Sequence, residues 1–321
     1  MSTKKLPKLL YHTFADWQAL EIKGPDAKDF LQRMTTVDFR DFPVGSHARG
    51  TLLQATGKIV LYFHVLRTAD QGFLLLVPPA KDNATGEEAS GAAAKAAEAF
   101  EKFHFMEKFT IERHGNEYAL LRVAGSPADE GIGSALTALG ARVFELNQWT
   151  EPVWEEHFAF DIGAVVPSAG LGAVTEALLN AGAAELDPAA RESFRVYFGE
   201  PAVPGEINSN VMPLEAGLED TVPENKGCYP GQEVIEKIRA IGQVPRRIVC
   251  IHAAGAAPAS GTKIEGRIEG APPAEAGVLT SVATDPTDSS KWVGLGIVKK
   301  IFLVGEPTFT VDGIPVQVRL K

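Results

Sequence analysis

The pattern of apolar and polar residues predicts alternating strands and helices in the first part of the chain. Apolar runs at 59–66 and 73–77, separated by the polar turn Asp70-Gln71-Gly72, indicate two paired strands. The Gly-Pro-Asp segment at 24–26 is typical of the start of a helix, which we expect to end at Met34. An alanine-rich stretch at 92–103, which follows a loop at 86–91, predicts a second helix with an aromatic face that needs a core.

The same pattern continues to about residue 244 and then changes. We expect further strands at 17–22, 109–113 and 118–123, and helices near 133–139, 174–181 and 189–198. This order predicts α+β sheets with helices on one face. From residue 245 onward, short apolar runs at 247–252, 263–265, 278–283, 293–299 and 308–311 alternate with Gly and Pro turns. They predict a small β-barrel or sandwich.

Composition excludes several classes of protein. The formal net charge of −10 argues against a general nucleic-acid binder, because phosphate recognition relies on basic surface. The sequence offers no continuous apolar stretch long enough for export or membrane spanning. Two cysteines in 321 residues cannot form a disulfide framework or a four-thiolate metal or cluster site. We therefore expect a protein of the reducing cytoplasm.

A local basic cluster stands against the acidic average. It comprises Lys226, Lys237, Arg239, Arg246 and Arg247. It could receive a polyanion such as the carboxylate tail of a cofactor, or it could be a solvated face, and the sequence does not decide between them.

The octapeptide 226–233, Lys-Gly-Cys-Tyr-Pro-Gly-Gln-Glu, is the strongest candidate for chemistry. Lys226 and a helix predicted to start at Gln232 would both favour the thiolate form of Cys228. The alternative is a buried, inert cysteine, but the flanking Gly and Pro residues are typical of turns. Cys250, in the apolar run 247–251, is expected to be core.

Other candidate sites are weak. The seven histidines show no metal-ligand spacing, so we expect no metal site, and His104 and His157 read as structural residues. Neither a nucleophile elbow nor a phosphate loop is present in the sequence.

The octapeptide resembles the signature K-G-C-Y-x-G-Q-E of the YgfZ family, folate-binding relatives of the glycine-cleavage T-protein that support iron–sulfur proteins. Lys226, Gly227, Cys228, Tyr229, Gly231, Gln232 and Glu233 match it. Flanking segments at 30–32, 35–38, 54–59 and 213–218 are also similar to the family, so that the resemblance spans about residues 15–300.

The resemblance implies a fold and a function. The fold would be two ferredoxin-like α+β domains and a C-terminal barrel, arranged as a ring around a folate cavity. Residues 1–244 would form the folate-binding region of two intertwined domains, and 245–321 the barrel. The ligand would be tetrahydrofolate or a one-carbon derivative, and the partners would be iron–sulfur client or assembly proteins.

Within the resemblance, Cys228 would be the reactive group, with Lys226 holding the thiolate by charge. The segment around Arg195 matches a family stretch whose acidic residue meets the pterin, but this chain has Tyr197 at that position. Glu200, Glu206 or Glu215 could compensate.

Three functions remain open. The first is a folate-binding accessory factor for the assembly or repair of iron–sulfur proteins. The second is a folate-dependent aminomethyltransferase or demethylase, although no Asp aligns with the catalytic position of the T-protein. The third is a redox switch without a ligand. Whether the chain is an enzyme is left undecided.

Overall fold

The structure, a computed structural model, describes residues 7–14, 16–79, 91–126, 131–146 and 158–321. The chain divides into two compact units. The sheet unit comprises Pro7–Leu186 and Asp220–Gln232, and the barrel unit comprises Asp187–Glu219 and Glu233–Lys321. The loop expected at 86–91, apart from Gly91, and His157 lie outside the described residues.

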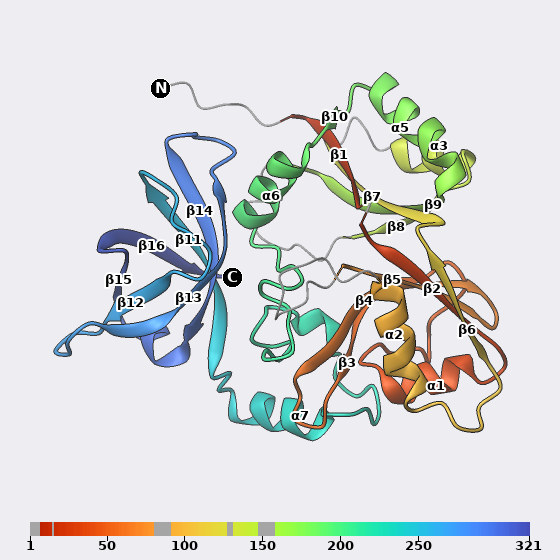
Figure 1. Ribbon diagram of the computed structural model, residues 1–321, viewed down its shortest axis with the longest axis horizontal. Coiled ribbons are helices and arrows are strands. Elements are labelled where there is room, and N and C mark those ends of the chain that lie inside the picture. The colour runs from red at the N-terminus through yellow and green to blue at the C-terminus, as the bar shows by residue number, and fades with distance from the viewer. Residues whose placement is uncertain (1–6, 15, 80–90, 127–130, 147–157) are drawn as a thin grey trace. The chain divides into compact units, whose positions relative to one another are not determined.

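The sheet unit contains an antiparallel sheet with the strand order β3-β4-β5-β2-β6. Two helices cover one face of it (Figure 1), because Phe30 and Leu31 of the first and Phe100 of the second share a core with Phe63 and Phe73 of the strands. The elements are β2 (Gln18–Lys23), α1 (Ala27–Met34), β3 (His47–Leu53), β4 (Ile59–Ala69), β5 (Gly72–Val77), α2 (Ala92–Glu101) and β6 (Thr110–Gly115).

A second sheet in the same unit has the order β10-β1-β7-β9-β8, and only its β1–β10 pair is parallel. Its helices also lie on one face, where Leu136 and Leu178 pack against Leu121 and Val166. The elements are β1 (Leu9–Phe14), β7 (Tyr118–Gly125), α3 (Ile132–Ala138), β8 (Arg142–Glu145), β9 (Phe160–Pro167), α5 (Leu171–Asn180) and β10 (Ala184–Glu185).

The two sheets pack together through their remaining faces. Leu66, Leu74 and Leu76 of one sheet share a buried cluster with Leu120 and Val165 of the other. The sheet unit is therefore layered as helices, sheet, sheet, helices, which buries both faces of each sheet.

The barrel unit is built on a closed barrel with the order β11-β14-β13-β12-β15-β16 (Figure 1). Its interior is filled by side chains that include Val249, Ile251, Leu279 and Trp292. The elements are α6 (Pro188–Tyr197), β11 (Arg246–Ala254), β12 (Lys263–Arg267), β13 (Ala274–Thr284), β14 (Lys291–Lys299), β15 (Thr308–Val311) and β16 (Ile314–Leu320). Helix α7 (Gln232–Ile241) begins where the chain leaves the sheet unit.

The structure confirms the predicted α+β class and resolves the choice between barrel and sandwich in favour of a closed barrel. The predicted helices and paired strands are present within a few residues of their expected bounds, and the strands β1, β3, β8, β9, β10 and β16 are additions to the prediction. The barrel strands begin at Arg246, while Asp187–Glu219 belongs to the same compact unit as the barrel. In the part of the chain that the structure describes, no helix is long and apolar enough to cross a bilayer.

Candidate functional site

The signature loop, residues 226–233, lies in the sheet unit up to Gln232 and rests against the turn between β3 and β4. Gly231 adopts a φ of 81°, which favours glycine. A Cβ at this position would lie 2.5 Å from the carbonyl oxygen of Gln54 in the turn. The turn itself is closed by a hydrogen bond from the Gly57 amide to that same carbonyl, at 2.9 Å. Close backbone approach therefore explains why glycine stands at position 231.

Lys226 anchors the loop to the end of α1. The residue is only 1% exposed, and its ammonium donates a hydrogen bond to the carbonyl oxygen of Gln32. In return, the Gln32 side-chain amide donates to the Lys226 carbonyl at 2.7 Å. Carbonyls in the last turn of a helix have no partner within it, so a buried cation at this end satisfies one of them.

Burial also changes the acidity of this lysine. Removal from water lowers the pKa of Lys226 to about 8, although Asp38 opposes that shift and Arg40 adds to it. Cys228 makes a smaller contribution that favours the charged ammonium. The predicted charge contact between Lys226 and the thiol remains a prediction, since the ammonium donates to α1 in the structure.

A second set of contacts fixes the residue before the lysine. Arg40 donates to the carbonyl of Asn225 at 2.6 Å and pairs with Asp38, also at 2.6 Å. This pairing, through hydrogen bonds from Arg40, lowers the pKa of Asp38 to about 2, so the aspartate is ionised near neutral pH. Asn225 itself has a φ of 59°, which turns the chain into Lys226.

Cys228 is exposed, while its neighbours on either side are held in place. Tyr229 is 7% exposed, and its ring lies 5.2 Å from the Lys226 ammonium. Gly227, with a φ of 98°, makes the turn that separates the buried lysine from the exposed thiol. The loop thus holds a thiol at the surface between two buried anchors, and the alternative of a buried cysteine is wrong for Cys228.

The predicted helix after the loop is confirmed and begins at Gln232. The Gln232 amide donates to the Tyr229 carbonyl at 3.2 Å. Glu233 is exposed in the first turn of α7, where a negative charge complements the helix dipole. Cys250, by contrast, is 1% exposed inside the core of the barrel unit, as expected.

Of the residues predicted for cofactor binding, Arg195 lies in α6 within a buried polar network of the barrel unit. Its guanidinium donates to Glu192 at 2.6 Å, to Ser281 at 2.6 Å, and to the carbonyl of Glu200. It also pairs at 3.2 Å with Glu206, which is 0% exposed. This network ties the segment after α6 to β13.

The other two predicted cofactor residues also belong to the barrel unit. Glu215 is 1% exposed and accepts hydrogen bonds from Arg246, at 2.8 and 2.9 Å, and from the Met212 amide. Tyr197 is half-buried against the barrel and lies edge-on to His252. The structure accounts for Arg195 and Glu215 as supports of the fold.

The basic cluster is largely neutralised by ion pairs. In the barrel unit, Arg239, Arg246 and Arg247 pair with Glu236, Glu215 and Glu219, respectively. Lys237 is exposed on α7. These pairs favour the solvated-face interpretation over a preformed polyanion site.

Gln32 is a hydrogen-bond partner of the signature loop that the sequence did not reveal. Its side chain bonds to the Lys226 carbonyl and, through its oxygen, to the Phe39 amide at 2.5 Å. Three segments that carry the family resemblance, namely α1 with its following turn, the β3–β4 turn and the signature loop, therefore meet at one place in the sheet unit. Because the sequence contains all three segments, their presence was the signal from which this meeting point could have been inferred.

Comparison with known proteins identifies one family profile, the GCVT N-terminal domain, which matches residues 14–226. A chloroplast protein of Arabidopsis thaliana, named as a transferase, is 26% identical over 302 residues, or 88% of this chain. The chain spans 63% of that relative's length. The tRNA-modifying protein YgfZ of Klebsiella pneumoniae is 26% identical over 252 residues, which cover 77% of this chain and 72% of the relative.

The solved structure of the aminomethyltransferase T of the glycine cleavage system from Bartonella henselae is similar over nearly the whole chain. The TM-score is 0.73 at 20% identity, with 99% of this chain and 86% of that chain covered. This likeness establishes a T-protein-like fold.

Proposed function

The chain belongs to the GCVT N-terminal domain family, which is folate-related and T-protein-like, and we propose that it is a reduced-folate-binding accessory factor in the assembly or repair of iron–sulfur proteins. In this proposal tetrahydrofolate or a one-carbon derivative is the ligand, and Cys228 is the reactive group. In this proposal the protein acts in the cytoplasm.

The observation that carries the proposal is an exposed thiol on an anchored loop. Cys228 is exposed, whereas Lys226 and Tyr229 beside it are buried. Thiolates are the reactive form of cysteine and attack carbon, sulfur or metal centres. A fixed loop presents such a group to a partner without the entropic cost of ordering it on each encounter.

The folate part of the proposal rests on family membership. Arg195 and Glu215 would act indirectly, by stabilising the barrel unit, since their side chains form hydrogen bonds within that unit. Tyr197 is the candidate for direct contact with the pterin, because an aromatic ring with a hydroxyl can both stack and hydrogen-bond.

The YgfZ relatives are named tRNA-modifying proteins, but we propose no general nucleic-acid binding for this chain. Its formal charge is −10, and the arginines near the signature loop in sequence are paired with glutamates. Any action on RNA-modifying systems would pass through their iron–sulfur proteins as clients.

An aminomethyltransferase is the alternative, favoured by the likeness to the Bartonella henselae fold. The two functions differ in whether they require the Cys228 thiol. Aminomethyl transfer uses the folate and a carboxylate, whereas the accessory role needs a nucleophile on the signature loop.

The ligand is tested by calorimetry with tetrahydrofolate, where we expect saturable binding. Cleavage of an aminomethyl-loaded carrier protein is measured on the same preparation and should be absent. Absence of binding at millimolar tetrahydrofolate would overturn the folate assignment, and carrier cleavage would establish the transferase.

The thiol is tested by the variant Cys228→Ser in cells that lack the native protein, with the activity of iron–sulfur enzymes as readout. The hydroxyl replaces an exposed thiol, so stability should change by less than about 0.5 kcal/mol, while rescue is lost because an alcohol supplies almost no anion at pH 7. Lys237→Ala on α7 is the matched surface control and should rescue fully. Full rescue by Cys228→Ser would remove the cysteine from the mechanism.

The reactivity of the thiol is measured separately by iodoacetamide labelling and mass spectrometry. Cys228 should label rapidly, and Cys250, which is 1% exposed in the barrel unit, should label only on unfolding. Equal labelling rates in the folded chain would contradict the assignment of Cys228 as the presented thiol.

A further inference from the structure

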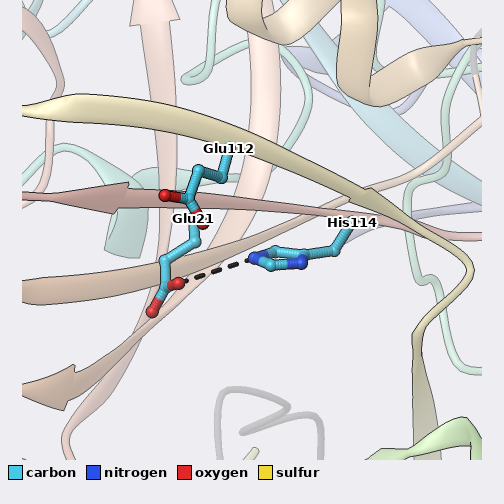
Figure 2. A group of neighbouring side chains, drawn as sticks. All are labelled: Glu21, Glu112 and His114. Carbon is cyan, nitrogen blue, oxygen red and sulfur yellow. Dashed lines mark ion pairs between the residues drawn. The ribbon is translucent and has the colours of Figure 1, made fainter.

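Three potential metal ligands gather on the edge of the β3-β4-β5-β2-β6 sheet, apart from the signature loop in sequence. Figure 2 shows Glu21 of β2 with Glu112 and His114 of β6, the side chains directed toward one another. One ligand atom from each of these residues lies within 4.8 Å of the other two.

Strand register produces this grouping. Glu21 lies directly opposite Glu112 in the antiparallel β2–β6 pair, and His114 follows Glu112 by two residues on the same strand. Two carboxylates in directly opposed positions repel each other, which disfavours the pairing unless a positive charge is shared between them. A bound cation would convert this repulsion into stabilisation.

The His114 ring is oriented by carboxylates on both sides. Its Nδ1 lies 3.3 Å from the Glu117 carboxylate, the kind of contact by which a carboxylate orients a metal-binding imidazole so that Nε2 faces the ion. The Nε2 atom is buried and has no hydrogen-bond partner among the described residues, and Glu21 Oε2 lies 3.5 Å from it. An imidazole nitrogen that is sequestered from water and directed at two carboxylates suits a metal ion.

We propose that Glu21, Glu112 and His114 bind a divalent transition-metal ion, with Zn²⁺ as the representative member of the class. In a tetrahedral zinc site with bonds near 2.0 Å, ligand atoms are about 3.3 Å apart, and Glu21 and His114 already stand at 3.5 Å. Glu112 is exposed, so that its carboxylate can rotate to close the site. The fourth position is left to solvent, and Glu117 positions the histidine from outside the coordination sphere.

The test is a calorimetric titration of the full chain with Zn²⁺, run in a Cys228→Ser background so that the exposed thiol does not contribute. We expect one bound ion per chain and a raised melting temperature in its presence. His114→Ala and Glu112→Gln should each weaken binding at least tenfold, and Glu117→Gln should weaken it on the order of 10- to 100-fold through the orientation of His114.

His104→Gln is the matched control, because His104 is also half-buried and paired with a glutamate, at 3.2 Å, but is not one of the clustered ligands. It should bind Zn²⁺ as the parent does. The visible spectrum with Co²⁺ provides a second readout, and its tetrahedral bands should disappear in His114→Ala. Glu112→Gln alters an exposed side chain and tests the site even if His114→Ala does not fold. Parent-like affinity in both variants, or no binding in the Cys228→Ser chain, would overturn the proposal.

Discussion

Lys226 holds the signature loop in place from a buried position. A buried ammonium is costly because it loses its hydration, and here a carbonyl of α1, the charge of Asp38 and the ring of Tyr229 compensate for part of that loss. The lowered pKa is the measurable sign of this cost. The same anchoring holds Cys228 at the surface next to it.

The first prediction concerns the pH dependence of stability. The pKa of Lys226 falls from 10.5 to about 8 on folding, so that between these values the unfolded chain binds more protons and stability rises with pH. At 1.36 kcal/mol per pKa unit, the rise amounts to about 3 kcal/mol. Lys226→Met lacks the titrating group and should lack this rise.

Urea unfolding of the native chain and of Lys226→Met, measured from about pH 7 to pH 10.5, checks this prediction. The difference in the free energy of unfolding should grow in favour of the native chain as the pH increases. Other groups that titrate in this range cancel in the difference. Parallel curves would show that Lys226 keeps an ordinary pKa in the folded chain.

At the scale of elements, the signature loop is held by contacts with two other segments of the sheet unit. Gln32 of α1 bonds to Lys226, and the β3–β4 turn contacts Gly231 through the Gln54 carbonyl. Gly227 and Gly231 therefore contribute to the loop conformation in different ways. Gly231 provides the left-handed backbone conformation and allows the close approach to the turn, while among the described residues, its chain neighbours aside, no atom lies within 4 Å of a Cβ placed at Gly227.

The second prediction follows from this difference. Gly231→Ala combines an unfavourable positive φ with a clash at 2.5 Å, and it should cost more than the roughly 1 kcal/mol expected of φ strain alone. Gly227→Ala, with φ strain in open space, is the matched control and should cost only that amount. Thermal melts give both values, and equal losses would contradict the close approach to the turn.

Much of the fold could be predicted from the sequence. The strands β4 and β5 follow from uninterrupted apolar runs, and α7 from its glycine-bounded start. Strand β16 escaped prediction because it contains Pro315 and is largely exposed, so that only its pairing with β11 and β15 defines it. Tertiary pairing, rather than local pattern, creates such strands.

The candidate site was predictable only in part, for the same reason. The octapeptide identified Cys228 and the glycines beside it, because their candidate roles depend on residues within the loop itself. Gln32 contacts Lys226 from 194 residues away, and no local pattern indicates that bond. Likewise, Glu21 joins Glu112 and His114 only through the register of β2 and β6, which is why the histidines showed no metal-ligand spacing along the chain.

At the scale of the whole molecule, the barrel unit is larger than its barrel. Helix α6 contributes Val196 to a buried cluster with Ile248, Cys250 and Leu295 of the strands. Arg195 adds polar contacts from the same helix to Ser281 of β13. The segment Asp187–Glu219 thereby covers apolar barrel surface that the sequence-based division at residue 245 would separate from it.

The last prediction compares two fragments that differ in this segment. The fragment 187–321 contains both long segments of the barrel unit, with the 220–232 segment of the sheet unit between them, and should unfold in one cooperative transition. The fragment 245–321 lacks Val196 and leaves Ile248 and Leu295 exposed on the barrel, so we expect it to aggregate or to melt without cooperativity. Circular dichroism melts and gel filtration of both fragments measure this. A cooperative melt of 245–321 at the temperature of the longer fragment would instead establish residue 245 as a true domain boundary, with α6 as a peripheral addition.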